Sequence, residues 1–245
     1  MAKARADVAL VNRGLVESRA KAQALIMAGK VFSGEARVDK AGAQIKDNEP
    51  LEVRGSDHPW VGRGGIKLDH AIRVFGLRAE GCTAIDVGSS TGGFTDVLLT
   101  NGATRVYAVD VGRGQLAWKL RNDPRVVVHE GVNARYLTEE QVPEKISAIV
   151  CDASFIGLQT VLERPLQFAD EGCWLAALIK PQFEVGREHI GKNGVVRDDV
   201  VRQACVDAIV DWLDKKDDWN VLGVTESPIT GAEGNVEFVV AAAKT

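Results

Sequence analysis

The most constraining feature of this chain is a glycine-rich turn between an apolar run and a helix-like run. Residues 83–85 are apolar, the turn reads Asp86-Val87-Gly88-Ser89-Ser90-Thr91-Gly92-Gly93-Phe94, and residues 95–99 read as a helix. Glycines let the backbone approach a ligand closely and hold positive φ angles. A strand, a glycine-rich turn and a helix start are typical of a nucleotide-like cofactor site, although the spacing differs from the dinucleotide motif G-x-G-x-x-G. The alternative is a helix-capping turn in another kind of α/β protein.

Strand-like and helix-like runs alternate after a helix expected over residues 66–77. Such alternation builds a doubly wound parallel sheet with right-handed crossovers. Only residues 227–234 join the last two strands, which is too short for a parallel crossover, so the final strand should run antiparallel. The expected strands are 83–87, 105–110, 126–129, 147–151, 174–179, 219–225 and 236–242, and the expected helices include 95–101, 114–121, 158–168 and 198–215.

This pattern resembles one enzyme class. An acid that ends the first strand two residues before the first glycine occurs in S-adenosylmethionine-dependent methyltransferases, and so does an antiparallel seventh strand. We therefore predict an α/β fold, a Rossmann-like class I methyltransferase sheet of seven strands with S-adenosylmethionine as cofactor. The predicted cofactor-binding residues are those of the turn and those after the following strands: Asp86, Gly88, Ser89, Ser90, Thr91, Gly92, Gly93, Phe94, Asp110, Val111, Asn133 and Asp152.

The N-terminal part reads as a separate, basic module. Residues 1–80 hold 14 Lys and Arg against 10 Asp and Glu, whereas residues 81–245 hold 16 against 24. This asymmetry favours a polyanion as partner of the first part, with an ordinary solvated surface as the alternative. Helices are expected over 5–13 and 19–28, with Ser18 as N-cap of the second, and short strands over 30–32, 37–38 and 51–53.

The N-terminal module is similar to the S-four type RNA-binding domain. The resemblance rests on the pattern from Arg5 to Val31, which includes Leu10, Arg13-Gly14 and Ser18-Arg19. It implies a small α+β domain over residues 1–57, a linker over 58–65 and a methyltransferase domain over 66–245. The predicted RNA-binding residues are Arg5, Arg13, Arg19, Lys21, Lys30 and Arg63.

Composition excludes several classes of protein. Of the residues, 45% are apolar and 26% charged, and no apolar run approaches the ~18 residues that a membrane helix needs. The N-terminus lacks the apolar core of a secretory signal, so we expect a cytoplasmic protein without a membrane role. The four cysteines and four histidines are dispersed, which indicates buried thiols and no metal site.

The residues after the strands also limit what is methylated. Exocyclic amine methylation usually goes with prolines after the fourth strand, but Asp152-Ala153-Ser154-Phe155 has none. Methylation of pyrimidine carbon five needs a cysteine in a loop, whereas Cys151 falls inside a strand and Cys205 in a helix.

A ribose hydroxyl is a poor nucleophile, and it benefits from a neighbouring amine whose pKa is depressed by burial and a second cation. Lys67, Asp152, Lys180 and Glu237 all fall where the predicted sheet would bring them to one edge. Each taken alone is equally consistent with a solvated strand terminus or edge residue.

Eight segments spread over nearly the whole chain resemble one family. They are Arg63–Leu68, Asp86–Thr95, Val111–Leu116, Arg121–Val126, Asn133–Arg135, Asp152–Ile156, Lys180–Gly186 and Gly234–Glu237. Together they resemble the TlyA/hemolysin-A family, which comprises ribosomal RNA 2′-O-methyltransferases that use S-adenosylmethionine and act on cytidine. The resemblance implies that Lys67, Asp152, Lys180 and Glu237 are the catalytic tetrad. Lys180 would activate the hydroxyl, Asp152 would orient it near the methyl group, and Lys67 and Glu237 would tune charge and position the ribose.

Gly62 departs from the family, in which serine is usual, and this would affect only the linker. The glycine-rich, mildly basic loop 186–194 is predicted either to grip RNA or to be an ordinary mobile loop.

Ribosomal RNA and ribosomal subunits are the expected partners, and the oligomeric state is open. Two other hypotheses are a non-enzymatic, membrane-active haemolysin and an RNA-binding protein whose methyltransferase domain is vestigial. The intact glycine turn and the four tetrad residues disfavour the vestigial reading.

Overall fold

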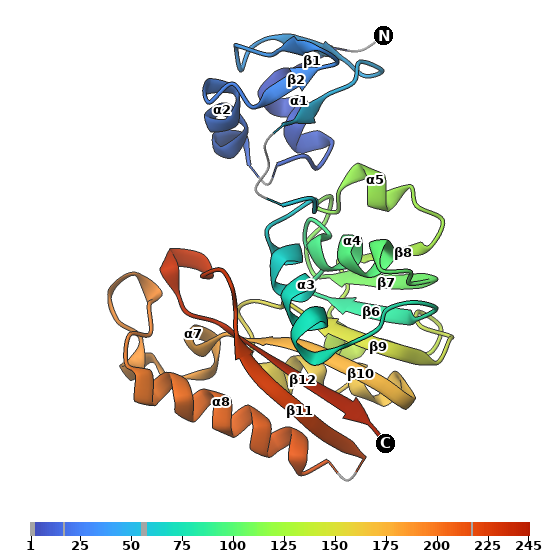
Figure 1. The fold of residues 1–245 in the computed structure, drawn as a ribbon, viewed down its shortest axis with the longest axis vertical. Helices are drawn as coiled ribbons and strands as arrows, with labels where there is room; N and C mark the ends of the chain where they lie inside the picture. The colour runs from blue at the N-terminus through green and yellow to red at the C-terminus, as the bar shows by residue number, and fades with distance from the viewer. Residues whose placement is uncertain (1–2, 17, 55–57, 217) are drawn as a thin grey trace.

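The protein, seen in a computed structural model, forms a small N-terminal body and a larger C-terminal one (Figure 1). The structure describes residues 3–16, 18–54, 58–216 and 218–245. Gly14, with a φ of 64°, packs directly against Ala117, so the two bodies touch at the segment before the short helix α5. The expected domain boundary at residue 57 lies outside the described residues.

The N-terminal body packs two helices against short strands. Its core contains Leu10, Ala22, Ile26 and Val31. The second helix begins as expected, because the Ser18 hydroxyl accepts a hydrogen bond from the Lys21 amide. The elements are β1 (Lys3–Arg5), α1 (Ala6–Asn12), α2 (Arg19–Met27), β2 (Val31–Ser33), β3 (Ala36–Arg37), β4 (Gln44–Lys46) and β5 (Glu52–Val53).

The small body departs from the sequence prediction at its edges. Arg5, the expected first residue of a helix, ends strand β1, which pairs antiparallel with β4. Neither strand was expected, because each is only three residues long and has too little periodicity to show in the sequence. The β2–β3 hairpin agrees with the strands expected over 30–32 and 37–38, and β5 pairs with β2, a pairing that the sequence did not predict.

The large body is built on a seven-stranded sheet in the order β11-β12-β10-β9-β6-β7-β8. Six strands run in the same direction, and β12 runs antiparallel to both of its neighbours, which confirms the predicted fold class. The strands are β6 (Thr83–Val87), β7 (Arg105–Asp110), β8 (Val126–Glu130), β9 (Ile146–Cys151), β10 (Ala169–Ile179), β11 (Trp219–Glu226) and β12 (Phe238–Lys244).

Helices cover both faces of this sheet, so successive strand residues enter two different cores (Figure 1). Ala84 faces α3 and α4, whereas Ile85 faces the side covered by α6 and α8. The helices are α3 (Gly64–Phe75), α4 (Gly93–Thr100), α5 (Trp118–Arg121), α6 (Leu158–Leu162), α7 (Pro181–Glu184) and α8 (Asp199–Asp214), with 3₁₀ turns η1 (Ala134–Tyr136), η2 (Pro165–Phe168), η3 (Arg187–His189), η4 (Lys192–Gly194) and η5 (Ala232–Gly234).

Three predicted elements have different limits in the structure. The helix expected over 158–168 divides into α6 and η2 because Pro165 has no amide hydrogen to continue an α-helix. The helix expected over 114–121 is only α5, since Gly114 takes a φ of 70°. The last strand begins at Phe238, so Glu237 precedes it instead of opening it.

Candidate functional site

A cavity of about 470 Å³ opens at the carboxyl ends of the central strands. It joins the glycine-rich turn to the four predicted catalytic residues, which come from four separate segments of the chain. Its wall is formed by residues 63, 64, 67, 88–91, 93, 94, 152, 154, 155, 180, 182, 183, 193, 194, 229–233, 235 and 237.

The four charged side chains of the predicted tetrad meet in this cavity. Lys67 Nζ lies 2.6 Å from Glu237 Oε2 and 3.6 Å from Asp152 Oδ1. Lys180 Nζ lies 2.7 Å from Asp152 Oδ1. The convergence expected from strand order is therefore present, with charges that alternate along a line from Lys180 through Asp152 and Lys67 to Glu237.

The local fold explains why these side chains converge. Lys67 lies in the first turn of α3, which packs against α4 directly after the glycine-rich turn. Asp152 and Lys180 follow the parallel strands β9 and β10. Glu237 comes from the opposite direction, because β12 is antiparallel and starts at the edge where the others end.

Burial differs along the line of charges. The Asp152 side chain is 20% exposed, whereas that of Glu237 is 2% exposed. Lys180 directs hydrogen bonds to the Asp152 carbonyl and the Ser154 hydroxyl, each at 2.9 Å. Of the four side chains, that of Asp152 is therefore the most exposed, whereas Lys180 and Lys67 are buried to a similar degree, at 7% and 9% exposed.

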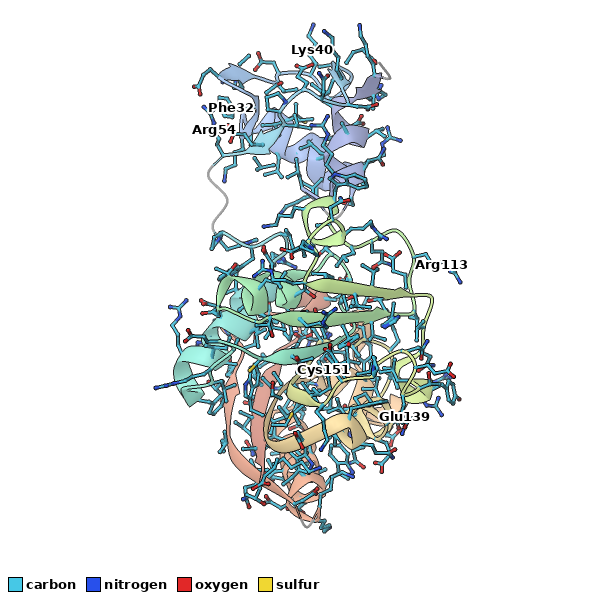
Figure 2. All side chains as sticks on the ribbon, turned by 90° about the vertical axis from the view of Figure 1, so that its right-hand side faces the viewer. Phe32, Lys40, Arg54, Arg113, Glu139 and Cys151 are labelled. Atoms are coloured by element: carbon cyan, nitrogen blue, oxygen red, sulfur yellow. The ribbon has the colours of Figure 1, made fainter. Side chains whose placement is uncertain are left out.

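Cys151 does not offer a competing nucleophile. It lies at the end of β9 inside the large body (Figure 2). Burial raises the pKa of its thiol to about 12, which keeps the sulfur protonated at neutral pH. All four cysteines are buried and free.

The glycine-rich turn is built for close backbone packing. Gly88 has a φ of 79°, and a Cβ there would lie 2.8 Å from the Ala153 Cα. A Cβ on Gly93 would lie 2.8 Å from the Gly65 amide nitrogen. Both positions therefore require glycine, and they bring the turn against the segments that carry Asp152 and Lys67.

Asp86 orders this turn from beneath and does not line the cavity. Its Oδ2 accepts hydrogen bonds from the Thr95 amide at 3.0 Å and the Thr95 hydroxyl at 2.6 Å. Burial raises the pKa of the Asp86 carboxyl to about 7. Its Oδ1 is buried without a hydrogen-bond partner among the described residues.

The other predicted cofactor residues lie farther along the same edge, outside the cavity wall. Asp110 accepts hydrogen bonds from the Ser90 amide at 2.8 Å and the Gly112 amide at 2.7 Å. Val111 beside it is 71% exposed. Asn133 caps η1 by accepting from the Arg135 amide. The first contact ties Asp110 to the glycine-rich turn.

The predicted RNA-binding residues divide into two groups. Arg5 and Arg19 both contact the buried Asp7 carboxylate at 3.0 Å while their own side chains stay about half exposed. Arg13 donates to the carbonyls of residues 46, 47 and 49 and is thereby a brace within the small body.

The other three predicted RNA-binding residues differ in their exposure to solvent. Lys21 and Arg63 are exposed, and Lys30 is half-buried. Arg63 also lines the cavity, so among these residues it lies closest to the tetrad.

Sequence reasoning missed several residues of the cavity wall. Gln182 donates from Nε2 to Glu237 Oε1 at 3.2 Å. Asn235, buried, joins two loops of the wall, since it accepts from the Val196 amide and donates to the Gly194 and Ala232 carbonyls. Both residues fall inside segments that resemble the TlyA/hemolysin-A family, Lys180–Gly186 and Gly234–Glu237. Their place in these segments was the signal that could have identified them.

Backbone strain is concentrated at the same cavity. Among the described residues, each non-glycine with a positive φ lines its wall, a backbone state that persists where the surroundings enforce it and that clusters at functional sites. One of them, Asn193, belongs to loop 186–194, so this loop reaches the mouth of the cavity. The residues are Ser90, Phe155, Asn193 and Glu233.

No group of three or more His, Cys, Asp or Glu side chains in the described ranges is placed to hold a metal ion. No helix in the part of the chain that the structure describes has the length and apolar character needed to span a membrane.

Comparison with known proteins identifies the family. Residues 60–244 match the FtsJ-like methyltransferase family, and residues 4–51 match the S4 domain. The chain is 45% identical over 237 residues to the 16S/23S rRNA (cytidine-2′-O)-methyltransferase TlyA of Mycobacterium tuberculosis, which covers 96% of this chain and 88% of that protein. The chain belongs to the TlyA/hemolysin A family of FtsJ-like methyltransferases.

Other members of the TlyA/hemolysin A family agree over the full length. Hemolysin A of Brachyspira hyodysenteriae is 40% identical over 96% of this chain and 98% of its own. A solved hemolysin-type structure from Streptococcus thermophilus shares 42% identity over 100% of this chain and 90% of its own, with a TM-score of 0.76. An S-adenosylmethionine-dependent methyltransferase structure from Listeria monocytogenes, at 15% identity and a TM-score of 0.55, supports the fold.

Proposed function

We propose that this protein transfers a methyl group from S-adenosylmethionine to the 2′-hydroxyl of a cytidine in ribosomal RNA. The observation that carries the proposal is the meeting of Lys67, Asp152, Lys180 and Glu237 in one cavity with the glycine-rich turn. The names of the TlyA relatives from Mycobacterium tuberculosis and Campylobacter jejuni support the substrate and the position of the methyl group.

The residues around the turn fit S-adenosylmethionine. The backbone of residues 88–93 approaches the cavity closely, and the buried Asp86 leaves one carboxylate oxygen unpaired. Residues 88–94 would hold the methionine end, and Asp110, Val111 and Asn133 would hold the nucleoside farther along the edge. When bound, the cofactor would supply an electrophilic methyl group on its positively charged sulfur.

The tetrad would then align and deprotonate the sugar hydroxyl. The 2′-oxygen would form a bond to the methyl carbon as the carbon–sulfur bond breaks, and the hydroxyl proton would leave the oxygen. A neutral Lys180 amine would accept this proton, and the resulting ammonium would be held by Asp152 and Ser154, whose oxygens lie within 2.9 Å of Nζ. Lys67 and Glu237 balance the charge on the far side of Asp152.

The N-terminal body would supply phosphate contacts. Arg5 and Arg19 hold fixed positions through Asp7, and Lys21 is exposed on the same helix as Arg19. Arg63, at the cavity wall, would guide the RNA strand toward the tetrad. We place this activity in the cytoplasm, with residues 1–57 as the RNA-binding domain, 58–65 as the linker and 66–245 as the methyltransferase domain.

The test is transfer of labelled methyl from S-adenosylmethionine to ribosomal subunits by wild type and Lys180→Ala, followed by mapping of the labelled nucleotide. We expect a 2′-O-methylcytidine with wild type and a loss of at least about 10²-fold with the variant. Cofactor binding by both proteins, with methyl transfer by wild type only, supports the proposal. No cofactor binding by wild type would favour a vestigial domain, and lysis of red cells by Lys180→Ala at the wild-type rate would favour a separate haemolytic activity.

A further inference from the structure

We propose that Gln182 is a positioning residue for methyl transfer: it fixes the carboxylate of Glu237 and thereby the ammonium of Lys67. The inference rests on the proposed function of the tetrad. It adds a neutral side chain, on α7 directly after Lys180, to the four charged ones.

Both oxygens of the Glu237 carboxylate are engaged by protein donors. Lys67 Nζ lies 2.6 Å from Oε2, and Gln182 Nε2 donates to Oε1 at 3.2 Å. Glu237 is 2% exposed and Gln182 is 9% exposed. A carboxylate held on both sides and shielded from solvent acts on the substrate through its partners, so its influence passes through Lys67.

The orientation of the Gln182 amide follows from charge. Its NH₂ group must face Glu237, because the amide oxygen would otherwise meet a carboxylate oxygen. In this orientation Gln182 Oε1 is buried with no hydrogen-bond partner among the residues that the structure describes. An unpaired buried acceptor is unfavourable for folding. The arrangement is therefore better explained by the position of Glu237 than by stability.

The position of Glu237 matters because two carboxylates share Lys67. Its ammonium lies 2.6 Å from Glu237 but 3.6 Å from Asp152. If the Glu237 carboxylate turned away, Lys67 would move toward Asp152 and compete with Lys180, which now lies 2.7 Å from Asp152. Gln182 prevents this exchange, and it therefore controls the charge around the lysine that receives the proton.

The test compares Gln182→Met and Gln182→Glu with wild type. Gln182→Met keeps the length of the side chain but removes the donor, so we expect kcat to fall at least tenfold while the KM for S-adenosylmethionine changes less than twofold. Gln182→Glu places two carboxyls about 3 Å apart, where they share one proton and one pKa rises. The protonated carboxyl replaces the lost donor.

Gln182→Glu should therefore be active at low pH and lose activity as pH rises and the shared proton leaves. The other charged groups near this pair are Lys67, Asp152 and Lys180, with Arg63 and Glu233 on the same cavity wall. Wild type retains the same Lys67, Asp152 and Lys180. Its pH profile of activity therefore shows the titration that these groups cause, and the loss of the shared proton in Gln182→Glu adds to it.

A matched control comes from α8. Gln203 also donates from Nε2 to a carboxylate, that of Asp207 at 2.8 Å, but both residues are exposed. Gln203→Glu should leave the pH profile unchanged because solvent screens the new pair.

Three outcomes would overturn the role of Gln182: wild-type kcat in Gln182→Met, a wild-type pH profile in Gln182→Glu, or equal losses of kcat and cofactor affinity. Failure of wild type itself to methylate RNA would instead refute the proposed function.

Discussion

A single methyl group added at Gly231, outside the tetrad, should slow methyl transfer by displacing the carboxyl group of Glu237. Gly231 lies against Glu237, and a Cβ built on Gly231 would overlap the Glu237 carboxyl group. Gly231 has a φ of −75°, so alanine adopts its backbone without strain. Gly231→Ala therefore tests the position of Glu237 without removing any charged group.

The magnitude follows from the contact distances. Non-bonded heavy atoms rest about 3.5–4.0 Å apart, so the Glu237 carboxyl would have to retreat by on the order of 1 Å or more. This movement stretches the 2.6 Å contact with Lys67 and the 3.2 Å contact with Gln182. A misplacement of about 1 Å can cost about 10²-fold in rate, or roughly 2.7 kcal/mol of transition-state stabilisation.

Single-turnover methyl transfer at saturating S-adenosylmethionine measures this loss directly. Cofactor affinity should stay within twofold of wild type, because residues 88–93 are not in contact with the new methyl group. A single-turnover rate within threefold of wild type would refute the argument that the Glu237 carboxyl must stay where the structure places it.

Three further predictions concern other parts of the molecule. Asp86→Asn should remove a pH dependence of stability. Because the pKa of the Asp86 carboxyl in the folded state is raised to about 7, its ionisation destabilises the native state as pH rises from about 4 to 7. The loss is up to about 4 kcal/mol. Urea titrations across this range should therefore show wild type losing stability relative to the variant. Neutralising Arg19 and Lys21 should flatten the salt dependence of RNA affinity by up to about 0.7–0.9 in slope for each, and an unchanged slope would exclude both as phosphate contacts. Arg13→Gln should instead lower the free energy of unfolding by about 1–3 kcal/mol, and with it the Tm, because it breaks hydrogen bonds to the carbonyls of residues 46, 47 and 49. It should leave the salt slope nearly unchanged.

The sheet of the large body was predictable because each strand is bounded by strong signals. The apolar run before Asp86 and the short loop 227–234 determined the first strand and the direction of the last, and the structure has both. The prediction was wrong at two kinds of place. The three-residue strand β1 depends on tertiary pairing with β4, which no local pattern shows. The helix expected over 158–168 ignored Pro165, whose missing amide hydrogen breaks the helix.

The charged residues of the candidate site were also predictable, since each stands next to the end of a strand or the start of a helix. Their neutral partners were not. Ser154, Gln182 and Asn235 have no charge or periodicity that marks them, and their contacts with the tetrad and the cavity wall arise only when four distant segments meet. The requirement for glycine at position 231 was not predictable either, because it comes from the contact with Glu237 and not from the turn itself.

These neutral partners divide the tetrad into two unequal halves. Lys180 and Asp152, supported by Ser154, form the half that contains the most exposed carboxylate, since Asp152 is 20% exposed. Lys67 and Glu237 form the inner half, where Glu237 is 2% exposed. The 3.6 Å separation between Lys67 and Asp152 is the longest of the three contacts and joins the two halves. A change at Glu237 should therefore reach Lys180 through Lys67 and Asp152, so variants of the inner half should alter kcat and its pH dependence more than the binding of S-adenosylmethionine.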